Sequence, residues 1–174
     1  MPKVIICGVY PRQILAYLEG EKDCELRKAA PNPKEKLGKR IEEVPLLIKT
    51  AGSPYGYIVG EVDEVIKGRP SEIWERYSQK FKFGIEKEIY DEYFSGAKQA
   101  TVIHFAQVKL IYPPLEGINS SQTFRYGNIP EQKWNLHPLS NETVRERLVE
   151  LTKKIQKELR EKYRHNKVML NKIG

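Results

Sequence analysis

The chain has 174 residues, with 30 Lys and Arg against 23 Asp and Glu, which gives a net charge of +7 and a pI near 9.3. This length predicts one domain, or one domain with an appendage, and 40% hydrophobic residues exclude a disordered chain. Mean hydropathy is -0.58, and the apolar runs are far shorter than the roughly 20 residues of a transmembrane helix, so we expect no membrane partner.

The amino-terminal residues enter an apolar run directly and lack the pattern of a secretory leader, so we expect a cytoplasmic protein. The two cysteines, Cys7 and Cys24, are too few for a disulfide framework and lack a CxxC partner or a histidine at metal-ligand spacing. We therefore expect packed thiols, no metal and no cofactor. The sequence motifs of dinucleotide binding, P-loop hydrolysis and the α/β-hydrolase elbow are also absent.

The chain begins with a strand and a helix. Residues 3–9 form an apolar run of strand length, and Pro11 suits the first turn of a helix that ends at Gly20. Residues 28–40 are polar and contain two prolines, which predicts a surface loop.

The middle of the chain predicts a hairpin followed by short helices. Residues 44–50 and 57–66 are strand-like and flank a turn rich in Gly and Pro. Residues 70–77 and 86–94 then predict two short helices.

The strongest strand signal is residues 100–112, which we expect to end at Pro113. His104 lies inside this strand and is expected to be packed or hydrogen-bonded. Residues 115–139 predict a long connection with aromatic residues. Strands separated by short helices, without regular alternation, favour an α+β fold with a small, strongly curved sheet or β-barrel.

The positive charge is concentrated at the carboxyl end. Residues 145–174 hold ten basic and four acidic residues and so carry +6, whereas the rest of the chain carries +1. Ser140 is placed as an N-cap with a hydrophobic staple across it, and apolar residues follow at helical spacing. We predict a basic amphipathic helix over 140–174, packed on a domain formed by 1–139. Its charges fit a solvated helix face and a nucleic-acid contact surface equally well.

The segment 20–27 contains the pattern G-x-K-x-x-E-x-R, formed by Gly20, Lys22, Glu25 and Arg27. Gly20 permits a sharp turn, and the extended stretch after it would let two cations and a carboxylate meet at the mouth of a cleft. Arginine binds phosphate or a base edge bidentately, and lysine adds a mobile charge. The alternative is a surface ion-pair cluster that contributes little to stability.

This pattern resembles the signature of the ASCH domain family, part of the PUA-like superfamily of small β-barrels. The resemblance covers roughly residues 3–135, and the whole chain is most similar to an archaeal branch of the family. It implies a PUA-like β-barrel with flanking short helices, extended here by the long carboxyl-terminal helix. It also implies a nucleic-acid ligand, either RNA or a modified base or nucleoside, bound at Gly20, Lys22, Glu25 and Arg27.

One ASCH branch is similar in sequence but hydrolyses an acetylated cytidine nucleoside with a catalytic lysine and a threonine nucleophile. Lys22 occupies the lysine position, but Glu25 stands where the threonine would be, which argues against the same mechanism. Glu61 resembles the acidic partner of that branch and would serve as general acid or base. An ordinary solvent-facing glutamate explains Glu61 equally well.

Exposed aromatic rings near loop and strand ends would stack on unpaired bases, and we favour Tyr55 and Trp134 for that role. Three hypotheses follow. The first is an RNA- or modified-base-binding domain assisted by the basic helix, active in RNA metabolism or transcription-linked regulation. The second is an amidohydrolase for an N-acylated nucleoside that uses Lys22, Glu25 and Glu61. The third is a protein-interaction module that uses the last helix.

Overall fold

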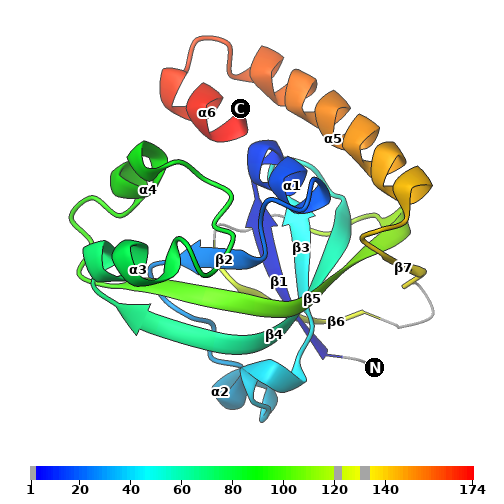
Figure 1. Ribbon diagram of the computed structural model, residues 1–174. Helices are drawn as coiled ribbons and strands as arrows, with labels where there is room; N and C mark the ends of the chain where they lie inside the picture. Colours follow the sequence, from blue (N-terminus) through cyan, green and yellow to red (C-terminus); the bar gives the residue numbers. More distant parts are fainter. Residues whose placement is uncertain (1–2, 120–122, 130–133) are drawn as a thin grey trace.

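The computed structural model describes residues 3–119, 123–129 and 134–174. Within these residues, seven strands form one mixed sheet in the order β2-β5-β4-β3-β1-β6, and β7 also pairs with β5 (Figure 1). The strands are β1 Lys3–Val9, β2 Cys24–Arg27, β3 Leu46–Thr50, β4 Gly56–Gly68, β5 Ala100–Leu115, β6 Arg125–Asn128 and β7 Leu136–Pro138. The helices are α1 Pro11–Leu18, α2 Pro33–Leu37, α3 Pro70–Tyr77, α4 Lys87–Tyr93, α5 Glu142–Lys162 and α6 Lys167–Ile173, with a 3-10 turn at Ile41–Glu43.

The sheet is strongly curved because its two long strands are bent. The register between β4 and β5 shifts on either side of Val62, and such bulges bend and twist a strand pair. The curvature brings the edge strand β2 towards β1 and the start of β6, where Arg27 of β2 donates to the carbonyl oxygen of Gly8 at 2.9 Å and lies over the ring of Phe124 at 5.4 Å. The structure therefore confirms a mixed α+β fold built around a small, curled sheet.

Three hydrophobic clusters hold the fold together. The larger core joins strands β1, β3, β4 and β5 to the helices α1 and α5, the smaller core lies between β2, β5 and the helices α3 and α4, and a third cluster joins α5 to α6. Strand β2 contributes to both faces because its side chains alternate: Cys24 and Leu26 pack in the smaller core, whereas Glu25 and Arg27 point the other way, towards Cys7.

Helix α5 packs closely on the curled sheet. Its buried side chains include Leu148, Ile155 and Leu159, and Thr152 forms a 2.5 Å hydrogen bond with the buried hydroxyl of Tyr57 in β4. The predicted apolar stripe is confirmed. The N-cap, however, is Asn141, whose side chain accepts from a backbone amide of the first turn, whereas we expected Ser140. Among the described residues, no helix combines the length and apolar character of a transmembrane span.

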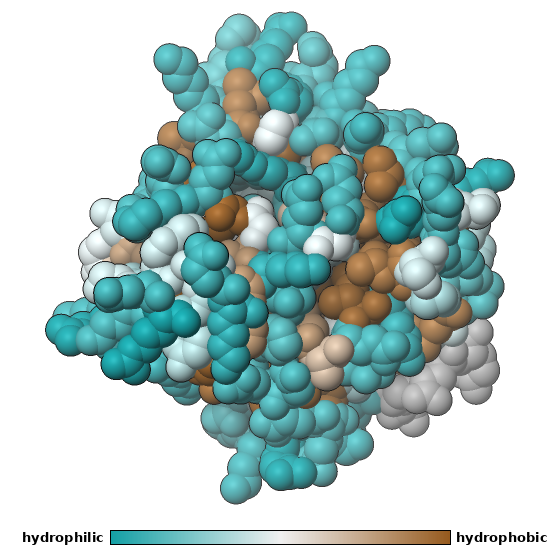
Figure 2. Space-filling view, viewed as in Figure 1, coloured by the Kyte–Doolittle hydropathy of each residue, from teal (hydrophilic) through white to brown (hydrophobic). Residues whose placement is uncertain are grey.

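Residues 140–174 do not form one continuous helix. After Lys162 the chain turns, Asn166 caps a second helix, and α6 folds back so that Ile173 is buried against α5 (Figure 1). Figure 2 shows that hydrophilic residues cover most of the face seen in Figure 1, with apolar residues visible in a few patches, the largest near the middle of the view.

Three other expectations differ from the structure. The predicted loop 28–40 contains α2, which starts at an Asn32 cap and ends at Gly38, and the predicted connection 115–139 contains β6 and β7. Strand β5 also continues past Pro113. In the pairing with β4, Leu110 is opposite Ile58 and Leu115 is opposite Gly56, and the residues between Leu110 and Leu115 have no partner in β4. The two prolines lie in this stretch, where the backbone N–H that they lack is not needed for a hydrogen bond to β4.

We predict that α5 unfolds together with the sheet. Replacing the fully buried Leu148 (Leu148→Ala) should lower the free energy of unfolding by about 2–5 kcal/mol, because it opens a cavity in the larger core. The measurement is denaturant unfolding followed by the fluorescence of Trp74 and Trp134, both outside α5. Val168→Ala, at a side chain that is 60% exposed, should change that free energy by less than about 0.5 kcal/mol. An unshifted fluorescence transition in Leu148→Ala would show that α5 is an independent appendage.

Candidate functional site

The turn after α1 positions the predicted motif. Gly20 adopts a φ of +72°, in the left-handed region that favours glycine, which confirms its predicted role in the turn. The chain then passes Lys22, which forms an isolated bridge with Phe83, and enters β2. Because β2 is extended, Glu25 and Arg27 lie on the same face, and the structure brings them together with Lys22.

Both carboxylate oxygens of Glu25 are held inside the protein. The hydroxyl of Tyr17 donates to Oε1 at 2.8 Å, and Nε of Arg27 donates to Oε2 at 3.0 Å. The Nζ of Lys22 lies 3.9 Å from Oε1, and the Glu25 side chain is only 4% exposed. A buried carboxylate with this many partners remains in place only because they replace its lost hydration. We call Cys7, Tyr17, Lys22, Glu25 and Arg27 the Glu25 cluster.

Lys22 is buried instead of lying at a cleft mouth. Its side chain is 3% exposed, and its Nζ donates to the carbonyl oxygen of Phe83 at 3.1 Å. The segment carrying Gly84 lies directly over the Lys22 side chain. A Cβ added to Gly84 would lie 2.8 Å from Cβ of Lys22, and the φ of Gly84 is +69°, so glycine alone permits this close cover.

Arg27 connects the Glu25 cluster to the surface. Its side chain is 18% exposed, and its Nη2 donates to Cys7 Sγ at 2.8 Å as well as to Gly8. Burial opposes its positive charge, but Cys7 and Glu25 outweigh that effect and raise the pKa of Arg27 above its ordinary value. The guanidinium is therefore a fixed cation with a small exposed area.

Aromatic, basic and hydroxyl groups surround the exposed part of Arg27. The ring of Tyr93 in α4 is 43% exposed and has the Nζ of Lys28 over it at 5.4 Å. Burial raises the pKa of Tyr93, and the positive charge of Arg27 opposes that effect. Thr101 of β5 lies directly opposite Arg27 in the strand pairing, fully buried, and its hydroxyl has no hydrogen-bond partner among the described residues. We call Arg27, Lys28, Tyr93 and Phe124 the Arg27 face.

The Glu25 cluster is suited to holding charge in place and poorly suited to nucleophilic attack. Burial raises the pKa of Cys7 to about 12, so the thiol remains protonated at neutral pH. Burial, followed by the charge of Glu25, also raises the pKa of Tyr17 well above its ordinary value. Glu25 has no oxygen without a close partner. What remains for a ligand is the Arg27 face.

The structure does not place Glu61, Tyr55 or Trp134 in the Glu25 cluster. Glu61 is 54% exposed on β4 and pairs with Lys109 at 3.6 Å, as an ordinary surface glutamate would. Tyr55 packs between the larger core and α5. Trp134 packs against the larger core next to β7, and its buried Nε1 has no hydrogen-bond partner among the described residues.

Sequence reasoning missed five residues of the site: Cys7, Tyr17, Lys28, Tyr93 and Phe124. One signal was available for Tyr17, which carries the one hydroxyl on the apolar face of α1. Lys28 directly follows the motif, whereas the other three come from segments far apart in the chain, and only the fold brings them towards Arg27. Within the described residues, no group of three or more His, Cys, Asp or Glu side chains is arranged to hold a metal ion.

The comparisons with known proteins identify the fold. The crystal structure of the ASCH protein from Zymomonas mobilis matches with a TM-score of 0.59 at 16% identity, covering 74% of this chain and 89% of that protein. Its tyrosine-to-phenylalanine mutant matches with a TM-score of 0.59 at 16% identity, covering 71% of this chain and 89% of the mutant. Its serine-to-alanine mutant matches with a TM-score of 0.58 at 16% identity, covering 84% of this chain and 94% of the mutant. No family model matches the chain, and no curated protein sequence matches it significantly. The structural matches confirm, at the level of the fold, the resemblance to ASCH domain proteins.

We predict that both thiols are inert in the folded protein. The pKa of Cys7 and that of Cys24 are raised, chiefly by burial, from 9.0 to about 12. Between those values the folded protein keeps protons that the unfolded chain releases, so stability should fall as the pH rises from 9 to 12. Urea unfolding across this window should show the decline, and it should be shallower in Cys7→Ala. Rapid labelling of the folded protein by a thiol reagent near neutral pH would contradict this account.

Proposed function

We propose that this protein binds RNA or a modified base, and that the ligand contacts the Arg27 face. The observation that carries the proposal is the guanidinium of Arg27. It donates hydrogen bonds to the carboxylate of Glu25 and to the carbonyl oxygen of Gly8, while part of the side chain reaches the surface. A charged group that is already held in place loses little conformational freedom when a ligand binds. Guanidinium groups recognise phosphate and base edges, and they also stack on planar rings.

The other members of the Arg27 face supply complementary chemistry. Tyr93 and Phe124 provide rings on which an unpaired base would stack, and Lys28 adds a second, exposed cation. The resemblance to the ASCH family implies the same class of ligand.

The geometry favours binding over hydrolysis of an acylated nucleoside. Lys22 and Glu25 are buried and engaged with Phe83 and Tyr17, while Glu61 is paired with Lys109 on the surface. A nucleophile, its activating lysine and an acid–base partner would have to face one substrate, which this arrangement does not provide.

We predict that removing the Tyr93 ring weakens RNA binding without unfolding the protein. Tyr93→Ala should raise the Kd for a fluorescein-labelled single-stranded RNA by roughly 5- to 150-fold, because stacking contributes about 1–3 kcal/mol per base. Tyr93→Phe, the matched control, keeps the ring and should bind like the unmodified protein. Fluorescence anisotropy gives the affinities, and equal Kd values for all three proteins would refute the placement of the ligand.

Arg27→Gln should weaken the same RNA by about ten- to a hundredfold, which is the range for a hydrogen bond to a charged group. Arg76→Gln, at an exposed arginine of α3, removes the same charge away from the site and should have little effect. Because Arg27→Gln also leaves Glu25 without its cation, thermal unfolding must show that the variant is folded at the temperature of the assay. A folded Arg27→Gln variant with unchanged affinity would exclude Arg27 from the interface.

Incubation with N4-acylated cytidine should release no cytidine, as followed by ultraviolet absorbance, because Glu25 has no free oxygen and Glu61 lies elsewhere. Turnover that disappears in Lys22→Met, with the variant shown to be folded, would replace the binding proposal with the hydrolase.

A further inference from the structure

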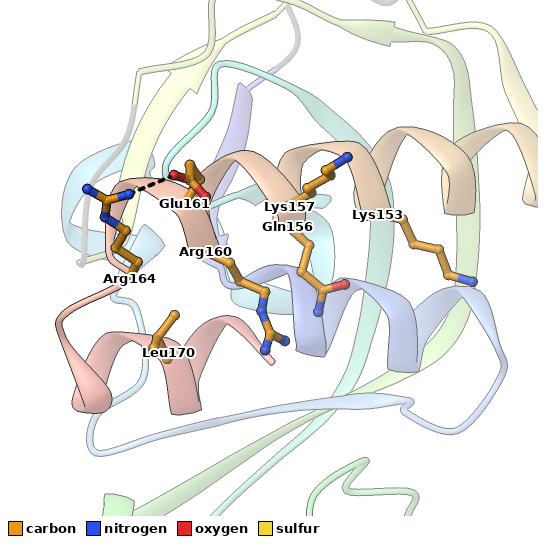
Figure 3. Close-up of a pocket in the computed structure, with 7 residues that line it drawn as sticks. All are labelled: Lys153, Gln156, Lys157, Arg160, Glu161, Arg164 and Leu170. Carbon is orange, nitrogen blue, oxygen red and sulfur yellow. Dashed lines mark hydrogen bonds and ion pairs between the residues drawn. The ribbon is translucent and has the colours of Figure 1, made fainter.

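The carboxyl-terminal hairpin of helices contains a second site, distinct from the Arg27 face. The residues that line the groove between α5 and α6 enclose about 410 Å³ and include four cations and one carboxylate. They are Lys153, Gln156, Lys157, Arg160, Glu161, Arg164 and Leu170 (Figure 3). Three of the cations, Lys153, Lys157 and Arg160, follow one another at steps of four and three residues and so form one row along α5, and Arg164 follows just past the end of the helix.

The return of α6 shapes this groove. Gln156 donates to the carbonyl oxygens of Ile173 and Gly174 at 3.1 and 3.2 Å, and Arg160 also donates to Gly174. Figure 3 shows the Gln156 and Arg160 side chains turned towards the end of α6. Ile173 is fully buried against α5, which fixes the two helices together. The groove is therefore a built feature of the hairpin.

Three of the four cations that line the groove are available to a partner, whereas Arg160 is engaged with Gly174. Lys153, Lys157 and Arg164 are exposed, and among the described residues neither lysine forms an ion pair. Arg164 pairs with Glu161 at 3.3 Å, but both side chains are more than half exposed, and such a pair is weak and easily exchanged.

We infer that this row binds the phosphate backbone of a single-stranded nucleic acid. From Lys153 to Arg160 the row rises about 10 Å along the helix axis, which leaves room for two or more consecutive phosphates of one strand. Leu170 is the one apolar residue among those that line the groove. The groove therefore lacks the apolar pockets in which the aromatic and aliphatic anchors of a protein partner are buried. One row of mobile cations instead matches backbone contacts, which depend on charge and are independent of sequence.

This inference shares the class of ligand with the proposed function but concerns a different surface, so each can fail alone. Within the Arg27 face, the uncharged ring of Tyr93 should contribute to affinity through stacking, so Tyr93→Ala should weaken binding and leave the salt dependence unchanged. The row should set the salt dependence, because each phosphate contact on a single strand adds about 0.7 to the slope of log K against log salt.

The test measures the Kd of a short fluorescein-labelled oligouridine over a series of KCl concentrations. The double variant Lys153→Ala, Lys157→Ala should lower the slope by about 1.4. The control, Lys154→Ala with Lys162→Ala, removes the same charge from exposed positions of α5 outside the groove and should leave the slope unchanged. All four lysines are exposed, so both variants should fold.

Equal slopes in the two double variants would overturn the inference, whether both fall or neither changes. An unchanged slope together with weakened binding in Tyr93→Ala would reject the row and retain the Arg27 face, and the reverse pattern would reject the Arg27 face alone. Polyglutamate of matched charge should displace the RNA much less well than unlabelled oligouridine. If it displaces the RNA equally well, the groove is a site for an acidic polypeptide and the inference is wrong.

Discussion

The ion pair between Glu25 and Arg27 determines how the rest of the site is arranged. A carboxylate that is 4% exposed would be strongly destabilising without compensation, so its neighbours must supply what water has lost. Tyr17 supplies a hydrogen bond from α1, and Arg27 supplies the charge from β2 itself. Because Arg27 also binds Gly8 of β1, the same guanidinium joins β2 to the strand that faces it across the curled sheet.

This constraint separates the motif into a buried part and a reachable part. Lys22 and Glu25 hold the cluster together, and Lys22 is covered by the segment containing Gly84. Of the three charged side chains only that of Arg27 reaches the surface, and it lies over the ring of Phe124, just before β6. The motif is therefore recognisable as a unit, although its members differ in position: Lys22 and Glu25 are buried, whereas Arg27 is held by Glu25 and keeps part of its side chain at the surface.

Local patterns in the sequence predicted the parts of the structure that depend on local spacing. The stripe of α5 follows from its helical period, and the meeting of Glu25 and Arg27 follows from alternation along one strand. The burial of Lys22 did not follow, because it depends on Phe83 and Gly84, some sixty residues away. Strands β6 and β7 are four and three residues long, too short for a periodic signal, and exist through their pairing with β1 and β5.

The placement of charge explains why the excess of +7 is informative only in part. On the α5 face that carries the cation row, the preceding positions are acidic, at Glu142, Glu146 and Glu150. Acids near the start and bases near the end of a helix complement its dipole, so this segregation alone would suit a purely structural helix. The packing of α6 against α5 is not required by the helix dipole. It forms one side of the groove along the basic part of α5, and the end of α6 accepts hydrogen bonds from Gln156 and Arg160. Charge that merely stabilised α5 would need no such groove, and this is why the hairpin, more than the net charge, points to a polyanionic partner.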